Sequence, residues 1–249
     1  MTGTVMRITH LWGGERWQSL LGDLSHTLAL ERFGPSLTER IFWQARTEKP
    51  IVALSFDDGP HPTFTRSLLD YFDREQVPAT FFLIGRYVQR NPELARRIAG
   101  AAHEIGNHTW SHRMLPFLPV RQIREEISRT HEIISEVTGR MPLYFRPPMG
   151  LFTKKTVSVV EQMGYRHVVG DVYPRDPNRP GTKKIIRRVL KRVRPGSLII
   201  LHDGGNTRNL DRSQTVQAVQ EIVPRLKDQG YRFVTLSELV QSDTRAGAG

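Results

Sequence analysis

The stretch Ile51-Val-Ala-Leu-Ser-Phe-Asp-Asp-Gly-Pro60 decides how the fold of this chain is predicted. Its first part, 51–56, is a short apolar and β-branched run, which predicts a buried strand. Asp57 and Asp58 follow at once, and Gly59 and Pro60 are turn formers. The stretch therefore predicts two carboxylates at the carboxyl end of a strand, although an Asp-Asp-Gly-Pro turn by itself is more often only a turn.

Strand patterns alternate with helix patterns downstream of this stretch. Further strands are expected over 79–83, 103–107, 143–146, 167–170, 197–201 and 232–236. Helices are expected between them, over 65–76, 92–100, 119–138, 154–163, 183–194 and 215–229. Such alternation predicts parallel strands joined by right-handed crossovers, and both an open sheet and a (β/α) barrel fit it.

Polar residues at the strand ends favour the barrel. They follow the carboxyl ends of five expected strands: Asp57 and Asp58, His108 and His112, Arg146, Asp171 and Asp176, and His202 and Asp203. Groups spread over many strand ends are typical of a (β/α) barrel, whereas an open sheet gathers them near one switch point. We predict an α/β barrel domain over residues 50–240.

The two ends of the chain are assigned separately. Residues 1–49 are predicted to form a short N-terminal helical extension packed on the barrel, because Ser36-Leu-Thr-Glu39 has the capping-box form and precedes an apolar run. Residues 241–249 are polar and small, which predicts a disordered tail.

Composition narrows the possible functions. The chain has 249 residues and no cysteine, which excludes disulfides, Cys-bound zinc and thiol nucleophiles. No apolar run is long enough to span a bilayer and no signal-peptide pattern is visible, so a cytoplasmic location is expected, while association with the cell envelope stays open.

The formal charge is +11, from 36 Lys and Arg against 25 Asp and Glu. This balance would attract a polyanion such as nucleic acid, an anionic membrane or an acidic cell-wall polymer. Part of the excess lies in 183–194, where basic residues form the outer face of an amphipathic helix. A solvated face is the simpler interpretation, and the lack of interleaved aromatic residues argues against a specific nucleic-acid partner.

A second motif, Asn107-His-Thr-Trp-Ser-His112, suggests a metal site. Its two histidines fall on one helical face or converge within a tight loop, and neutral imidazoles suit zinc and similar metals. A lone pair of histidines is more often structural. Combined with an aspartate, the pair would make three ligands and leave positions open for water and substrate, which is typical of a catalytic site.

Four motifs together resemble one family. Ser55-Phe-Asp-Asp-Gly-Pro60, His108-Thr-Trp-Ser-His112, Arg146-Pro-Pro-Met-Gly150 and Leu201-His-Asp203 are similar in order and spacing to the NodB-homology polysaccharide deacetylases, also called carbohydrate esterase family four. The resemblance covers about residues 50–240. It implies a distorted (β/α)7 barrel and metal-dependent removal of acetyl groups from chitin oligosaccharides, peptidoglycan or related glycans, with xylan esters as substrates of some members.

The resemblance also implies roles for individual residues. Asp57 would be the general base, held by Arg146, and His202 the general acid. Asp58, His108 and His112 would bind one divalent cation, expected to be zinc, with cobalt or another divalent metal as the alternative. Leu201 would line the pocket for the acetyl methyl group, and a backbone N–H near Met149 would stabilise the oxyanion.

Two departures from the family pattern concern the substrate pocket. Met149 stands where an aromatic residue is usual, and Asp176-Pro177 stands where Asp-Trp is usual. Asp176 best matches the carboxylate that tunes the catalytic histidine, with Asp171 as its rival. Further substrate contacts are expected from Pro148, Met149, His61 and Trp110, although packing explains Trp110 equally well.

The sequence therefore predicts a hydrolase that removes N-acetyl groups from an N-acetylated glycan. One alternative is the same mechanism on a non-sugar amide or an O-acetyl ester. Another is a non-catalytic carbohydrate-binding pseudoenzyme, against which the complete set of catalytic residues argues. The single histidines His103, His131 and His167 are expected to be structural.

Overall fold

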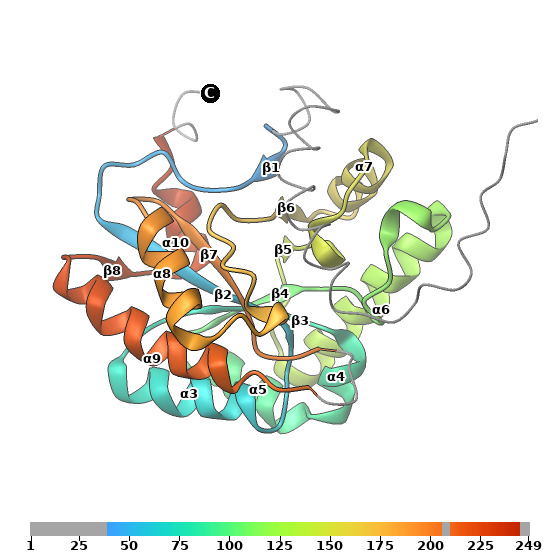
Figure 1. Cartoon of the computed structure of the whole chain (residues 1–249). Helices are drawn as coiled ribbons and strands as arrows, with labels where there is room; N and C mark the ends of the chain where they lie inside the picture. The colour runs from blue at the N-terminus through green and yellow to red at the C-terminus, as the bar shows by residue number, and fades with distance from the viewer. Residues whose placement is uncertain (1–38, 206–209, 245–249) are drawn as a thin grey trace, which may run out of the picture.

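A computed structural model describes residues 39–205 and 210–244, in which a parallel sheet is enclosed by helices (Figure 1). The described strands are β1 Ile41–Phe42, β2 Ile51–Gly59, β3 Thr80–Leu83, β4 Glu104–Asn107, β5 Tyr144–Phe145, β6 Arg166–Val168, β7 Leu198–His202 and β8 Arg232–Phe233. The strand that the Asp-Asp-Gly-Pro stretch predicts is β2, and it extends through both aspartates.

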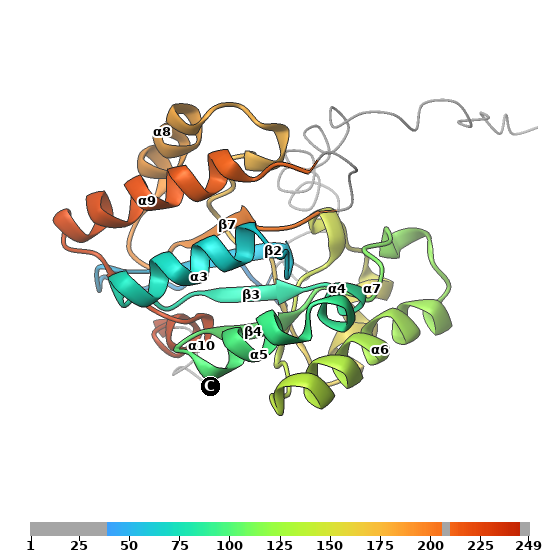
Figure 2. The same ribbon diagram turned by 90° about the horizontal axis from the view of Figure 1, so that it is seen from below.

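The described helices alternate with these strands. They are α3 Phe64–Glu75, α4 Gly85–Arg90, α5 Pro92–Gly100, α6 Val120–Thr138, α7 Lys154–Gln162, α8 Thr182–Arg192, α9 Ser213–Asp228 and α10 Leu236–Gln241, with short 3-10 turns η1 Leu115–Phe117, η2 Pro148–Gly150 and η3 Asp176–Asn178. Successive neighbours in the order α8, α9, α3, α5, α6 and α7 contact one another, so these helices form an arc along the outer side of the strands (Figure 2). No helix among those described is both long and apolar enough to cross a membrane.

The strands form a distorted barrel. Their order is β1-β6-β5-β4-β3-β2-β7, every adjacent pair is parallel, and β8 pairs with the start of β2. Two isolated bridges, Gln44 with Ser197 and Val172 with Ile199, join the two ends of this order. The predicted α/β barrel is confirmed, and its closure brings the carboxyl ends of all these strands around one mouth.

Alternation along β2 separates the core from the site. Leu54 and Phe56 pack among the helices α3, α5, α8 and α9, where the Phe56 ring stacks on Phe81 at 5.3 Å. Ser55 and Asp57 point the opposite way, because successive side chains of a strand face opposite sides. Asp57 is thereby turned into the barrel, at its carboxyl end.

Both chain ends differ from expectation where they are described. Ile41 and Phe42 form a strand, not a helix, because their backbone pairs with the edge strand β6, a tertiary contact that overrides local pattern. The rest of the predicted helical extension, 1–38, lies outside the described residues. The predicted disordered tail is ordered as far as Thr244. Asp243 is buried and accepts a hydrogen bond from the Arg46 N–H, and the Thr244 N–H donates to the Arg46 carbonyl oxygen. Residues 245–249 lie outside the described residues. The division of the chain at these ends stays a prediction.

Candidate active site

Two adjacent carboxylates face the site from the end of β2. A strand would turn Asp57 and Asp58 to opposite faces, but the register with β3 shifts between Asp57 and Gly59, and Asp58 has a φ of 74°. Such an irregularity re-aims a side chain beside a site. Both carboxylates are therefore available at the barrel mouth.

Asp57 is held by a buried arginine. Arg146, which follows β5, donates from Nη1 to Asp57 Oδ1 at 2.6 Å and to Ser55 Oγ at 2.9 Å. Its guanidinium lies 4.0 Å from the Phe82 ring centroid. Arg146 is only 2% exposed, and a charge so buried needs its partner, so the pair fixes the position of Asp57.

Asp58 lies between two imidazoles. Its Oδ1 is 3.5 Å from His108 Nε2 and 3.1 Å from His112 Nε2, and the candidate ligand atoms of the three residues lie within 4.8 Å of one another. Burial alone would raise the pKa of Asp58, but His112 and His108 hold it well below its ordinary value. Asp58 Oδ1 is buried and has no hydrogen-bond partner among the described residues, which fits a carboxylate ligand to a cation.

Both histidines turn Nε2 toward Asp58. His108 Nδ1 lies 2.7 Å from the carbonyl oxygen of Arg146, an acceptor that places the proton on Nδ1 and leaves the Nε2 lone pair toward Asp58. Burial lowers the pKa of His112 to about 4, so this ring is uncharged at neutral pH. Thr109 and His112 both have positive φ, so the two histidines converge through a tight loop and not along a helical face.

His202 ends β7 and is bound to Asp176. Its Nδ1 lies 3.0 Å from Asp176 Oδ1, and its backbone N–H donates to Asp176 Oδ2 at 2.9 Å. Thr215 donates a further hydrogen bond to the same carboxylate. Burial would lower the pKa of His202, but Asp176 outweighs it, and Asp58 and Asp57 add to the effect, so that the pKa is raised.

Asp171 takes no part in this contact. Its carboxylate accepts hydrogen bonds from Ser197 Oγ at 2.9 Å and from the Leu198 N–H at 2.7 Å, which join the chain after β6 to the start of β7. The geometry thus gives His202 the partner Asp176, and Asp171 has a structural position.

The prediction for Leu201 is wrong. Leu201 is fully buried and packs with Phe56, Ile199 and the residues of the surrounding helices, on the face of β7 opposite His202. Residues two apart in a strand share a face, so the apolar neighbour of His202 inside the barrel is Ile200. Ile200 packs with Phe152 and Val169, and the partly buried Tyr173 lies against this cluster.

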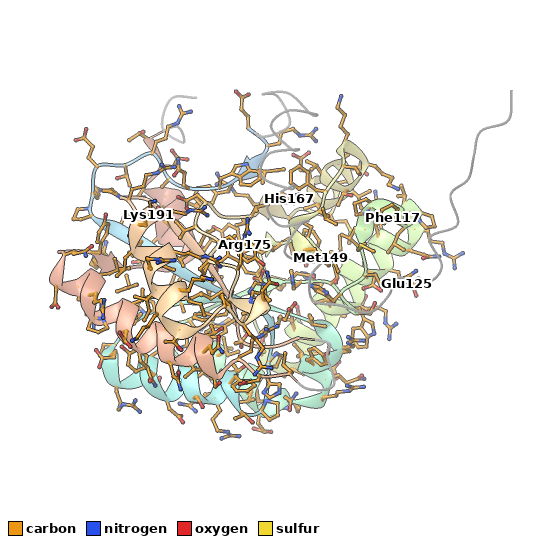
Figure 3. The ribbon with its side chains drawn as sticks, in the orientation of Figure 1. Phe117, Glu125, Met149, His167, Arg175 and Lys191 are labelled. Atoms are coloured by element: carbon orange, nitrogen blue, oxygen red, sulfur yellow. The ribbon has the colours of Figure 1, made fainter. Side chains whose placement is uncertain are left out.

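Two of the predicted substrate contacts, Pro148 and Met149, belong to the turn η2. Pro148 is buried and Met149 half-buried in η2, and Met149, labelled in Figure 3, has a φ of 59°. The N–H groups of Gly150 and Leu151 donate the hydrogen bonds of this turn, and the Met149 N–H is not one of these donors.

Trp110 and His61 both contact other residues of the protein. The Arg129 guanidinium lies 4.0 Å from the Trp110 ring centroid, which favours packing over sugar stacking. His61 Nδ1 accepts the N–H groups of Thr63 and Phe64, so its proton lies on Nε2, which is the atom left for a substrate.

Asp203, a polar residue at the end of β7 with no role predicted from the sequence, adjoins the site. It is fully buried beside Gly59, accepts a hydrogen bond from Thr65 Oγ1, and donates its backbone N–H to Asp57 O at 3.2 Å. Burial raises its pKa to about 7. Its place after a strand end and next to His202 was the indication in the sequence.

A family model described as polysaccharide deacetylase matches residues 44–168, half of the chain. The chain belongs to the polysaccharide deacetylase family. A peptidoglycan-N-acetylglucosamine deacetylase of Bacillus cereus is 40% identical over 206 residues, covering 82% of this chain and 94% of the relative. A chitooligosaccharide deacetylase of a Bradyrhizobium species is 37% identical, covering 76% and 90%.

Solved structures of polysaccharide deacetylases share the fold. A peptidoglycan N-acetylglucosamine deacetylase in complex with an N-hydroxybenzamide superposes with a TM-score of 0.79 at 33% identity, covering 84% of this chain and 97% of that chain. A pseudoenzyme of carbohydrate esterase family four from Bacillus anthracis superposes with a TM-score of 0.75 at 26% identity, covering 82% and 69%. The resemblance and the enzyme class predicted from the sequence are confirmed.

Proposed function

We propose that this protein hydrolyses N-acetyl groups of an N-acetylated glycan of the chitin-oligosaccharide or peptidoglycan type, using one divalent cation. One observation carries the proposal. Asp57 and His202, each fixed by its own charged partner, lie beside the three-residue cluster of Asp58, His108 and His112. The deacetylase relatives support the choice of substrate.

The difficulty of the reaction explains why these groups are needed. Water is a weak nucleophile and an amide nitrogen a poor leaving group. A cation held by Asp58, His108 and His112 would polarise the acetyl carbonyl and acidify a water molecule. Two imidazoles and one carboxylate suit zinc, with cobalt or another divalent metal as the alternative.

Asp57 and His202 are proposed to move the protons. Arg146 and Ser55 hold Asp57 in place, and the carboxylate accepts the proton of the attacking water. His202, whose pKa Asp176 raises, is proposed to donate in its protonated form from Nε2 to the departing amine. The N–H of Met149 is proposed to stabilise the oxyanion, and Ile200 to line the acetyl pocket.

Acetate release distinguishes this proposal from its alternatives. The substrates are N-acetylglucosamine tetramer, peptidoglycan fragments and an aryl acetate, each tested with added zinc. We expect acetate from the tetramer or the fragments, abolished by His202→Ala. Release from the aryl acetate alone would favour an esterase, and no release from any of them would favour the pseudoenzyme.

We also propose that the glycan is presented in an acidic polymer that the basic face of α8 attracts. Lys183, Lys184, Arg187, Lys191 and Arg192 are exposed on this helix, and none of them pairs with an acidic residue among those described. Lys191 lies to one side of Met149 in Figure 3. No apolar side chain interrupts this face, which supports a soluble polyanion over a membrane.

A further inference from the structure

Tyr173 lies inside the barrel next to His202. It belongs to the connection between β6 and η3, where Val172, the preceding residue, packs in the outer core and bridges to Ile199 of β7. Tyr173 packs in the opposite direction, against the cluster that contains Ile200 and Phe152, and its ring centroid is 6.0 Å from that of His202. Its ring thus contributes to the apolar wall beside the proposed acid.

The Tyr173 hydroxyl makes no hydrogen bond to any of the residues that the structure describes, and its side chain is half-buried. The other inward tyrosine, Tyr144, is satisfied, since its hydroxyl lies 3.1 Å from Ser237 Oγ. A hydroxyl on a ring that packs next to His202, with no hydrogen bond to the described residues, is free to bind a ligand.

The carboxylates of the site act on this hydroxyl through their charge. Burial raises the pKa of Tyr173, and the carboxylates of Asp176, Asp57 and Asp58 raise it further, so the phenol stays protonated. A neutral hydroxyl near three carboxylates is a hydrogen-bond donor in a site otherwise rich in acceptors.

We propose that the Tyr173 hydroxyl donates a hydrogen bond to a sugar oxygen next to the acetamido group, on the His202 side of the site. This inference rests on the proposed function, because it assumes that a glycan occupies the mouth. The contact would select N-acetylated sugars over simple acetyl compounds, which lack that oxygen.

The test compares Tyr173→Phe with the matched variant Tyr144→Phe on N-acetylglucosamine tetramer and on an aryl acetate. Tyr173→Phe should lower kcat/KM for the tetramer by about 2- to 13-fold, the value of one hydrogen bond, and leave both the aryl acetate rate and Tm unchanged. Tyr144→Phe should lower Tm and leave kcat/KM for the tetramer unchanged, because its hydroxyl bonds only to protein.

Three results would overturn the inference. They are an unchanged tetramer rate in Tyr173→Phe, an equal loss on the two substrates, and a shift of the basic limb of the pH–rate profile, since the last would mean that Tyr173 acts through His202. If the wild type releases no acetate at all, the proposed function fails separately. Calorimetric binding of the tetramer then decides, with weaker binding by Tyr173→Phe expected and equal binding contradicting the contact.

Discussion

Asp57 and Asp58 are neighbours in the chain but have different partners. Asp57 pairs with Arg146, whereas Asp58 meets the two imidazoles. Because a buried guanidinium already balances the charge of Asp57, this carboxylate is not needed to balance a cation. Asp58 lies between two imidazoles, and its charge is the one available to a cation. The two aspartates should therefore be separable by mutation.

Asp57→Asn tests this separation. The amide keeps the size of the side chain but does not accept the proton of water, so acetate release should fall by about 10²- to 10⁴-fold. Zinc binding, measured by calorimetry, should persist, and Asp58→Asn serves as the control that weakens it. Near wild-type turnover in Asp57→Asn would refute its role as the base.

Asp176→Asn tests the tuning of His202. Asp176 raises the pKa of His202, so removing its charge should lower that pKa and deplete the protonated acid at lower pH. The basic limb of the pH–rate profile for the tetramer should then move to lower pH. Asp171→Asn should leave the limb in place, because its hydrogen bonds go to Ser197 and Leu198. An unmoved limb in Asp176→Asn would contradict the pairing.

At the scale of residues, polar groups were easier to predict than apolar ones. The family resemblance implies the cluster of Asp58, His108 and His112 and the partner Asp176, and the structure brings these side chains together. The acetyl pocket was assigned to Leu201 although strand alternation already places Ile200 on the His202 face. Tyr173 carries no motif, since its position depends on how the chain crosses from β6 to η3.

At the scale of elements, the long helices and the strands between them were predictable, whereas β1, α4 and α10 were not. Two capping-box patterns illustrate the difference. Thr235-Leu-Ser-Glu238 caps α10, a helix that was missed at the end of an expected strand. Ser36-Leu-Thr-Glu39 predicts the start of a helix, yet Ile41 and Phe42 join the sheet. Such short segments are decided by tertiary pairing, which the local sequence does not contain.

The imidazole of His167 on β6 is buried without a hydrogen bond to any described residue. It is fully buried, its centroid lies 5.9 Å from that of Phe145 and 5.4 Å from that of Phe152, and neither ring nitrogen has a hydrogen-bond partner among the described residues. Burial lowers its pKa to about 3, below the ordinary 6.5. The unfolded chain therefore binds the proton more readily, and stability is lost as the pH falls from the ordinary pKa toward the folded one.

His167→Leu should stabilise the protein. Removing a buried polar group that lacks partners should add about 1–3 kcal/mol to the free energy of unfolding, with a larger gain in acid than at neutral pH. Thermal unfolding over this pH range measures it. His103→Leu is the control and should destabilise, because His103 Nδ1 accepts the Ala79 N–H. A lower Tm for His167→Leu at every pH would contradict this account.

At the scale of the whole molecule, charge is unevenly distributed. The carboxylates of the site lie at the barrel mouth, while α8 carries its lysines and arginines without acidic neighbours in the described ion pairs. A triple change of Lys183, Lys184 and Arg187 to Glu should weaken binding to polygalacturonate about tenfold or more at low salt, with little effect on the neutral tetramer.

The control for this test alters three exposed arginines on other helices, Arg74, Arg90 and Arg121, to Glu. It makes the same change in net charge without touching α8. An equal loss of polymer binding in the two triple variants would mean that only the net charge matters and would remove the special role of α8.

The central claim is that one cation at Asp58, His108 and His112 makes this barrel a deacetylase. The most direct measurement is acetate release from N-acetylglucosamine tetramer while zinc is titrated into chelator-treated, metal-free protein. The account predicts no release without metal, recovery that saturates at one equivalent, and neither tight metal binding nor release in the variant His108→Ala/His112→Ala. Full release by the metal-free protein, or recovery with one equivalent of zinc in that variant, would contradict it.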